Sequence, residues 1–179
     1  LEAMEAKMDE IGDRLRVVLI NSPNNPSGAV YSEEQIKGLA ELLRKASAKQ
    51  GKPVFLASDE PYRFLAYDDV QVPSVLAQYP YSIVVSSFSK SLSLAGERVG
   101  YALLAPEMPD KQELAEGIVL ANRILGFVNA PAVGQVLMGK CLNAQVDVDE
   151  YEARRQAMAK VLRDAGYEFF MPQGAFYFF

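Results

Sequence analysis

The sequence predicts an α/β protein with three layers, α/β/α, built on a mostly parallel sheet that contains one antiparallel strand. Short apolar runs rich in β-branched residues alternate with longer segments whose apolar residues recur at helical spacing. This alternation favours right-handed crossovers between parallel strands, with helices on the faces of the sheet. A short irregular link before the last strand leaves no room for a crossover, so that strand is expected to run antiparallel. The expected strands lie near residues 16–20, 54–58, 82–86 and 99–104.

The first half of the chain predicts two helices around the first strand. Residues 3–13 have helical composition. A second helix is expected after Ser32, which forms a capping box with Gln35, and it should end at Gly51. Residues 63–81 contain two prolines and are expected to form a loop. The apolar stripe of the second helix consists of Ile36, Leu39, Ala40 and Leu43.

The second half of the chain predicts three more helices and a final strand. Pro172-Gln173-Gly174-Ala175 is expected to lead into that strand. The last helix should bury an apolar stripe of Tyr151, Met158, Val161, Leu162 and Ala165. The three helices are expected to be one capped by Asp110 with Glu113, one around residues 133–142, and a long one that begins near Asp147 or Asp149 and stops at Gly166.

Composition excludes several classes of function. The 179 residues carry a net charge of −5, which argues against nucleic acid or an anionic membrane surface as a partner. No apolar run reaches the length of a membrane span. The single cysteine, Cys141, can form no internal disulfide, so we expect a reducing, cytoplasmic compartment. The chain has no histidine, which removes Ser-His and Cys-His nucleophile pairs and histidine metal sites, and we expect no metal.

Polar clusters follow three of the predicted strands. They are Asn21 to Asn25, Asp59 with Tyr62, and Ser87 to Lys90. Because the carboxyl ends of parallel strands meet at one edge of a sheet, these clusters are expected to converge on one crevice. Arg98 follows closely enough to fold back beside Lys90 and hold a phosphate.

Each of these residues also has an ordinary structural interpretation. Most lysines are solvated, so Lys90 taken alone is more easily explained as a surface residue. The asparagine-rich loop is a common turn sequence, and Tyr62 can be a half-buried aromatic. Arg98 can simply pair with Glu97. These alternatives remain open for each residue taken singly.

Four motifs, taken together and in order, resemble those of the class I/II (fold type I) aminotransferases. These are Asn-Pro-Ser-Gly at 25–28, Ser-Asp-Glu-Pro-Tyr at 58–62, Ser-Phe-Ser-Lys at 87–90 with Gly-Glu-Arg-Val-Gly at 96–100, and Pro-Gln-Gly-Ala-Phe-Tyr at 172–177. The resemblance covers essentially the whole chain. It implies an enzyme that uses pyridoxal 5'-phosphate to move an amino group between an amino acid and a 2-oxo acid, and that works as a homodimer.

The resemblance also implies a role for each site residue. Lys90 would carry the cofactor as a Schiff base and shuttle protons. The Asn25–Pro26 peptide bond would be cis. The other expected cofactor contacts are Asn25 and Tyr62 at the ring oxygen, Asp59 at the pyridine nitrogen, and Ser87, Ser89 and Arg98 at the phosphate.

The resemblance further predicts how the chain is divided. Residues 1–146 would be part of the cofactor-binding large domain, and residues 147–179 would be a connecting helix and the start of a small domain. The chain opens at Leu1 and closes on an apolar run, so we expect a fragment that is inactive alone. Two other functions stay open: a carbon–sulfur lyase of the same fold, and a non-enzymatic ligand-sensing domain of a regulator.

Overall fold

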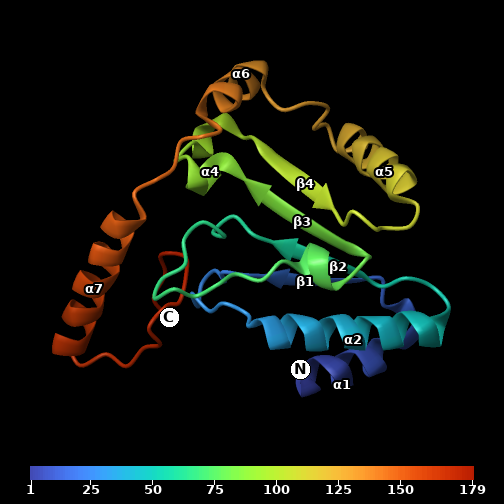
Figure 1. Cartoon of the computed structure of the whole chain (residues 1–179), viewed down its shortest axis with the longest axis horizontal. Helices are drawn as coiled ribbons and strands as arrows, with labels where there is room; N and C mark the ends of the chain where they lie inside the picture. Colours follow the sequence, from blue (N-terminus) through green and yellow to red (C-terminus); the bar gives the residue numbers. More distant parts are fainter.

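The computed structural model describes residues 1–179 and is built on one four-stranded sheet (Figure 1). Its strands, in their order across the sheet, are β1 (Val17–Asn21), β2 (Phe55–Asp59), β3 (Ser82–Ser87) and β4 (Gly100–Leu104). The first three run parallel, and β4 runs antiparallel to β3. The predicted α/β class, the four strands and the direction of the last strand are therefore confirmed.

Seven helices and two short 3₁₀ turns connect and flank these strands. They are α1 (Glu2–Ile11), η1 (Gly12–Arg14), α2 (Glu33–Gln50), α3 (Val75–Gln78), α4 (Phe88–Ser91), η2 (Ala95–Glu97), α5 (Lys111–Ile124), α6 (Ala132–Cys141) and α7 (Val148–Asp164). Each predicted helix is present. The predicted loop of residues 63–81 contains the single turn α3. No helix combines the length and the apolar character needed to cross a membrane.

Local sequence signals explain both ends of α2. The Ser32 hydroxyl accepts a hydrogen bond from the Gln35 amide, and the Gln35 side chain accepts one from the Ser32 amide. This is the predicted capping box, which satisfies two amides that the helix itself cannot bond. At the other end Gly51 adopts a φ of 67°, a left-handed conformation that favours glycine.

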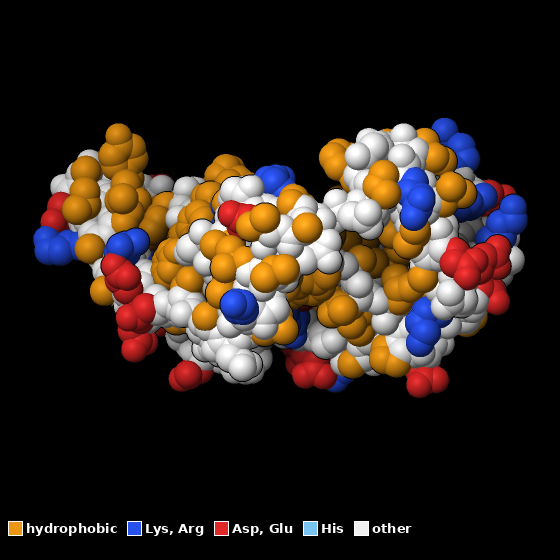
Figure 2. Space-filling view, turned by 90° about the horizontal axis from the view of Figure 1, so that it is seen from above, with side chains coloured by type: hydrophobic (Ala, Val, Ile, Leu, Met, Phe, Trp, Pro, Cys, Tyr) orange, Lys and Arg blue, Asp and Glu red, His pale blue; other side chains and the backbone are white.

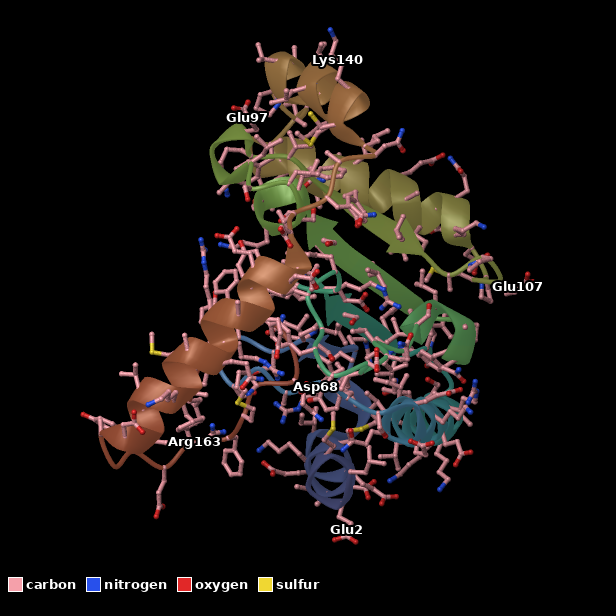
Figure 3. All side chains as sticks on the ribbon, turned by 60° about the vertical axis from the view of Figure 1, so that its left-hand side comes forward. Glu2, Asp68, Glu97, Glu107, Lys140 and Arg163 are labelled. Carbon is pink, nitrogen blue, oxygen red and sulfur yellow. The ribbon has the colours of Figure 1, made fainter.

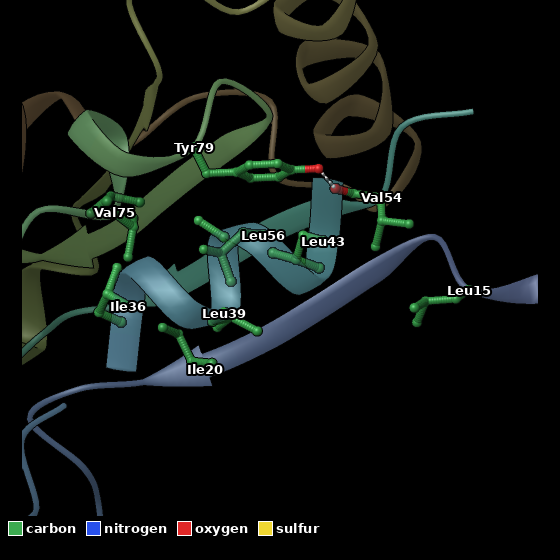
Figure 4. Packing of buried hydrophobic residues seen from close by; sticks show 11 residues of the cluster. Leu15, Ile20, Ile36, Leu39, Leu43, Val54, Leu56, Val75 and Tyr79 are labelled. Atoms are coloured by element: carbon green, nitrogen blue, oxygen red, sulfur yellow. Dashed lines mark hydrogen bonds between the residues drawn. The ribbon is translucent and has the colours of Figure 1, made fainter. Parts of the chain in front are cut away.

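The hydrophobic core lies between α2 and one face of the sheet (Figure 4). All four residues of the predicted α2 stripe are buried there. Tyr79 completes the cluster, and its hydroxyl donates a hydrogen bond to the Val54 carbonyl at 2.7 Å. On the opposite face Val17, Leu19 and Val85 are 53, 70 and 44% exposed. Over these strands the predicted second helical layer is therefore absent, and one face of the sheet is open.

Two details of the predicted helices are wrong. Asp110 makes no side-chain cap to α5, because its φ of 52° places it in the left-handed region rather than in the extended conformation of an N-cap. In α7 the N-cap is Asp147, but Met158 and Val161 of the predicted apolar stripe are exposed. The buried positions of α7 are Arg155 and Ala159.

Arg155 can be buried because its guanidinium is fully engaged. It forms ion pairs with Asp68 (labelled in Figure 3) and Glu152, and it donates a hydrogen bond to the Pro172 carbonyl at 2.7 Å. It also lies 4.3 Å from the centroid of the Tyr67 ring, a cation–π distance. Such contacts offset the cost of removing the charge from water. They join α7 to the loop that follows β2.

The residues after α7 do not form the expected strand. We call residues 172–177 the return segment, because they run back from α7 to the loops at the end of β1 and β2 (Figure 1). The amides of Gln173 and Gly174 both donate to the Gly28 carbonyl, and the amide of Ala175 donates to the Leu65 carbonyl. Because these bonds go to two different loops, only an isolated bridge forms and no strand ladder develops.

Glycine is required where the return segment passes these loops. A Cβ atom on Gly174 would lie 2.7 Å from Cβ of Pro23 and 2.9 Å from the Leu65 carbonyl oxygen. Gly28 has a φ of 68°, in the left-handed region, and its side-chain position is occupied by Pro172. The two glycines let three chain segments approach closely beside the carboxyl edge of the sheet.

Candidate functional site

The three predicted polar clusters follow parallel strands whose carboxyl ends lie at one edge of the sheet. In the register of the sheet Asn21 pairs with Asp59, and Asp59 pairs with Val85. Side chains alternate between faces along a strand, so Ser87, two residues after Val85, lies on the same face as Asp59. This is the open face of the sheet. The side chains at this edge are therefore accessible from that face.

Asp59 is a half-buried carboxylate without a positive partner. The Asn21 side-chain amide donates to the Asp59 carbonyl at 2.9 Å and to its carboxylate at 3.3 Å. Burial raises the pKa of the Asp59 carboxyl above its ordinary value, and no neighbouring cation offsets this. A cationic group bound beside Asp59 would stabilise the ionised carboxylate and lower its pKa again.

Tyr62 lies one turn beyond Asp59, and the return segment covers it. Its hydroxyl is hydrogen-bonded to the hydroxyl of Tyr177, and the two rings meet edge to face at 5.5 Å between centroids. The Phe176 ring packs on Tyr62 in the same manner at 5.2 Å. Burial, together with the contact to Tyr177, raises the pKa of Tyr62. The phenol therefore keeps its proton and remains a hydrogen-bond donor at neutral pH.

Lys90 lies on α4, the single turn that begins where β3 ends. The residue is half-buried, and its ammonium forms no ion pair and lies 5.6 Å from the centroid of the Phe176 ring. Phe176 thus contacts both Lys90 and Tyr62. Ser87 and Ser89, on either side of Phe88, are half-buried residues, and their hydroxyls form no hydrogen bond within the chain. These polar groups are free to bind a ligand.

Two of the predicted residues lie further out. Arg98 is exposed and follows η2, which packs against α4. Its guanidinium donates only to the Ala95 carbonyl, at 3.0 Å, so the alternative pairing with Glu97 is wrong. The Asn25–Pro26 bond is cis, as predicted. The Asn25 side chain is exposed and is not hydrogen-bonded to another site residue.

The site includes residues to which sequence analysis assigned no role. Phe176 and Tyr177 belong to the last motif, whose resemblance pointed only to the start of another domain. Asn21, at the end of β1, holds Asp59. Glu60 is buried, and its carboxylate accepts hydrogen bonds from Ser58 at 2.7 Å and from Arg63 at 2.8 Å. Its backbone amide donates a hydrogen bond to the Val85 carbonyl. The only sequence signal for these residues was their place beside or within a motif.

The chain is similar in sequence to known aminotransferases. The family described as aminotransferase class I and II matches residues 1–179. A probable aspartate/prephenate aminotransferase of Aquifex aeolicus is 30% identical over 99% of this chain and 45% of its own length. Aromatic-amino-acid aminotransferase 2 of Thermococcus litoralis is 28% identical over 93% of this chain and 42% of its own length.

Solved structures of other aminotransferases share the fold. An amino transferase from Eubacterium rectale is 46% identical and superposes with a TM-score of 0.89, covering 96% of this chain and 43% of that structure. An aspartate aminotransferase from Thermotoga maritima is 30% identical with a TM-score of 0.79. The chain spans less than half the length of these relatives.

Proposed function

Because the chain belongs to the class I and II aminotransferases, we propose that the protein carrying it is a transaminase that depends on pyridoxal 5'-phosphate. It would transfer an amino group between an amino acid and a 2-oxo acid. One observation carries the proposal: Lys90, without an ion-pair partner, lies at the same edge of the sheet as the unpaired carboxylate of Asp59 and the protonated phenol of Tyr62.

The chemistry of these side chains fits the cofactor. When bound, pyridoxal phosphate supplies an aldehyde for an amine and a ring that accepts electrons from the substrate. The Lys90 amine would hold the aldehyde carbon and, once the substrate amine has displaced it, would move a proton from the substrate's α-carbon to the former aldehyde carbon. Asp59 would pair with the protonated ring nitrogen, whose charge offsets the burial that raises the pKa of Asp59.

The remaining residues would position the cofactor. Tyr62 would donate a hydrogen bond to the ring oxygen, with Asn25 beside it. Ser87, Ser89 and Arg98 would bind the phosphate, and a planar guanidinium suits this task because it can donate two parallel hydrogen bonds. In support, the two serine hydroxyls form no hydrogen bond within the chain, and Arg98 donates only to the Ala95 carbonyl.

The wider assembly is part of the same proposal. Residues 1–146 would form part of the cofactor-binding domain, and residues 147–179 would lead into a small domain. The protein would act as a homodimer with amino acid and 2-oxo acid substrates. Exposed apolar side chains on and after α5 support association, because large apolar patches often mark interfaces (Figure 2). These include Ile124, Leu125, Phe127, Val133 and Val136.

Absorbance spectroscopy of the full-length protein tests the function. We expect added pyridoxal phosphate to produce a cofactor band in the visible or near-ultraviolet range, together with transamination of amino acids. Lys90→Ala should abolish both the band and turnover, whereas Lys140→Ala, an exposed control on α6, should leave both unchanged. A band and turnover that persist without Lys90 would contradict the proposal. Release of ammonia and sulfide from cysteine in place of transamination would identify a carbon–sulfur lyase instead.

A further inference from the structure

We propose that Tyr177 is a positioning residue of the cofactor site. In this proposal its hydroxyl donates a hydrogen bond to the phenol oxygen of Tyr62, so that the proton of Tyr62 is directed to the anionic ring oxygen of the bound cofactor. The inference rests on the proposed function and extends it to a residue of the return segment.

The two phenols meet in a partly buried place. The Tyr62 side chain is almost completely buried, and the Tyr177 hydroxyl is the only hydrogen-bond partner of its hydroxyl. The Phe176 ring packs on both tyrosines, at 5.2 Å from Tyr62 and 4.8 Å from Tyr177 between centroids. Tyr62 is buried and Tyr177 is half-buried, and each phenol has a single proton, so the orientation of one hydroxyl constrains the other.

Other contacts hold the return segment in place. Its backbone is bonded to Gly28 and Leu65, and the Tyr67 hydroxyl donates to the Ala175 carbonyl at 2.7 Å. Arg155 holds the start of the segment through the Pro172 carbonyl. With these bonds present, the contact between the Tyr177 and Tyr62 hydroxyls is not needed to anchor the segment. Its consequence lies in the orientation of the Tyr62 proton.

Each tyrosine hydroxyl has one proton, so it matters which of the two tyrosines donates in the hydrogen bond between them. A phenol carries one proton and can also accept a hydrogen bond. If Tyr62 donated to Tyr177, no proton would remain for a ligand. A hydrogen bond to an anion is stronger than one between neutral groups, so an anionic oxygen in the site draws the Tyr62 proton towards itself. Tyr177 then donates to Tyr62, and the two bonds strengthen each other.

A double-mutant cycle on the full-length protein tests this relay. The variants are Tyr62→Phe, Tyr177→Phe and the double substitution, each measured for pyridoxal phosphate affinity and for the pH midpoint of the cofactor band. Removing one hydrogen bond should weaken cofactor binding by about fivefold in Tyr177→Phe. The pH midpoint should move in the same direction as in Tyr62→Phe, but by less. In the Tyr62→Phe background the second substitution should change neither quantity, because the relay is already broken.

A matched control separates the relay from a merely structural role. Tyr67→Phe also removes a hydroxyl that contacts the return segment, but that hydroxyl binds the Ala175 carbonyl and not a cofactor-binding side chain. It should leave the affinity and the pH midpoint unchanged. The midpoint is measured on folded, cofactor-loaded protein, so a loss of stability does not imitate the effect.

The outcomes distinguish the two proposals. A wild-type protein that forms no Lys90-dependent band would overturn the proposed function and the relay with it. A normal wild-type band with unchanged affinity and midpoint in Tyr177→Phe would overturn the relay alone. The relay also fails if Tyr177→Phe has the same effect with and without Tyr62, or if Tyr67→Phe reproduces it.

Discussion

Two adjacent carboxylates at the end of β2 show how position alone separates a carboxylate engaged within the chain from one that stays available to a ligand. Glu60 is buried but satisfied, since Ser58 and Arg63 both donate to it. Asp59 lies on the open face of the sheet, half-buried, with only a long contact from the Asn21 amide. Successive side chains at a strand end point to opposite faces, so one carboxylate fastens the turn and the other stays available to a ligand.

The raised pKa of Asp59 predicts a pH dependence of stability in the absence of cofactor. Between its ordinary value of 3.8 and its raised value, the folded protein binds more protons than the unfolded chain. The contribution of Asp59 to stability is therefore most favourable at low pH and declines as the pH rises through this window. In Asp59→Asn this decline should be absent. As the pH rises, the free energy of unfolding of the variant should therefore increase relative to that of the wild type. Chemical denaturation at a series of pH values measures this, and parallel curves would contradict it.

The return segment is the element that brings distant parts of the sequence together. It contributes no strand to the sheet and is held between the loops after β1 and β2 by backbone bonds and close packing. Gly174 is a point of close packing, with Pro23 on one side and the Leu65 carbonyl on the other. Neither neighbour is the end of a flexible side chain, so neither can move aside easily.

We therefore expect Gly174→Ala to destabilise the protein by about 1–3 kcal/mol, because the new methyl group overpacks a rigid contact. The amide of Ala175, which is bonded to Leu65, should exchange faster with solvent. Gly139→Ala in α6 is the matched control. A Cβ there meets no atom within 4 Å, and alanine is the better helix former, so stability should stay equal or rise slightly. Equal stability of Gly174→Ala and wild type would contradict this account of the packing.

The whole molecule has one well-packed core and one open sheet face. The core lies between α2 and the sheet, whereas apolar side chains of β1 and β3 are exposed on the other face. More exposed apolar residues lie on and after α5 (Figure 2). The site residues lie along the edge of the open face, so any group that covers this face also encloses the site.

The 179-residue chain produced alone should therefore self-associate and bind pyridoxal phosphate only weakly. The full-length protein should form a stable, Lys90-dependent cofactor band and turn over amino acids. The physical reason is that apolar surface exposed to water favours association, and a ligand held from one side is poorly positioned. Sedimentation velocity and absorbance spectroscopy on both proteins provide the comparison. A monomeric chain that turns over amino acids would show that further sequence is unnecessary.

The sequence by itself determined the sheet and the set of side chains at its carboxyl edge. Strand runs, the Ser32 capping box and the α2 stripe are local patterns, and local patterns report which positions are buried and where an element starts. The common location of Asp59, Tyr62 and Lys90 could also be predicted, because a parallel sheet brings the carboxyl ends of its strands to one edge. These features needed no knowledge of distant contacts.

Only the tertiary structure decided the place of the return segment, the buried arginine of α7 and the pairing of Tyr177 with Tyr62. Arg155 can be buried because its guanidinium pairs with Asp68 and Glu152 and donates to the Pro172 carbonyl. The apolar stripe predicted for α7 gave no sign of these contacts. The two tyrosines are 115 residues apart. Periodicity describes which face of an element avoids water, but it does not specify which partner covers that face. That choice depends on the packing of the whole chain.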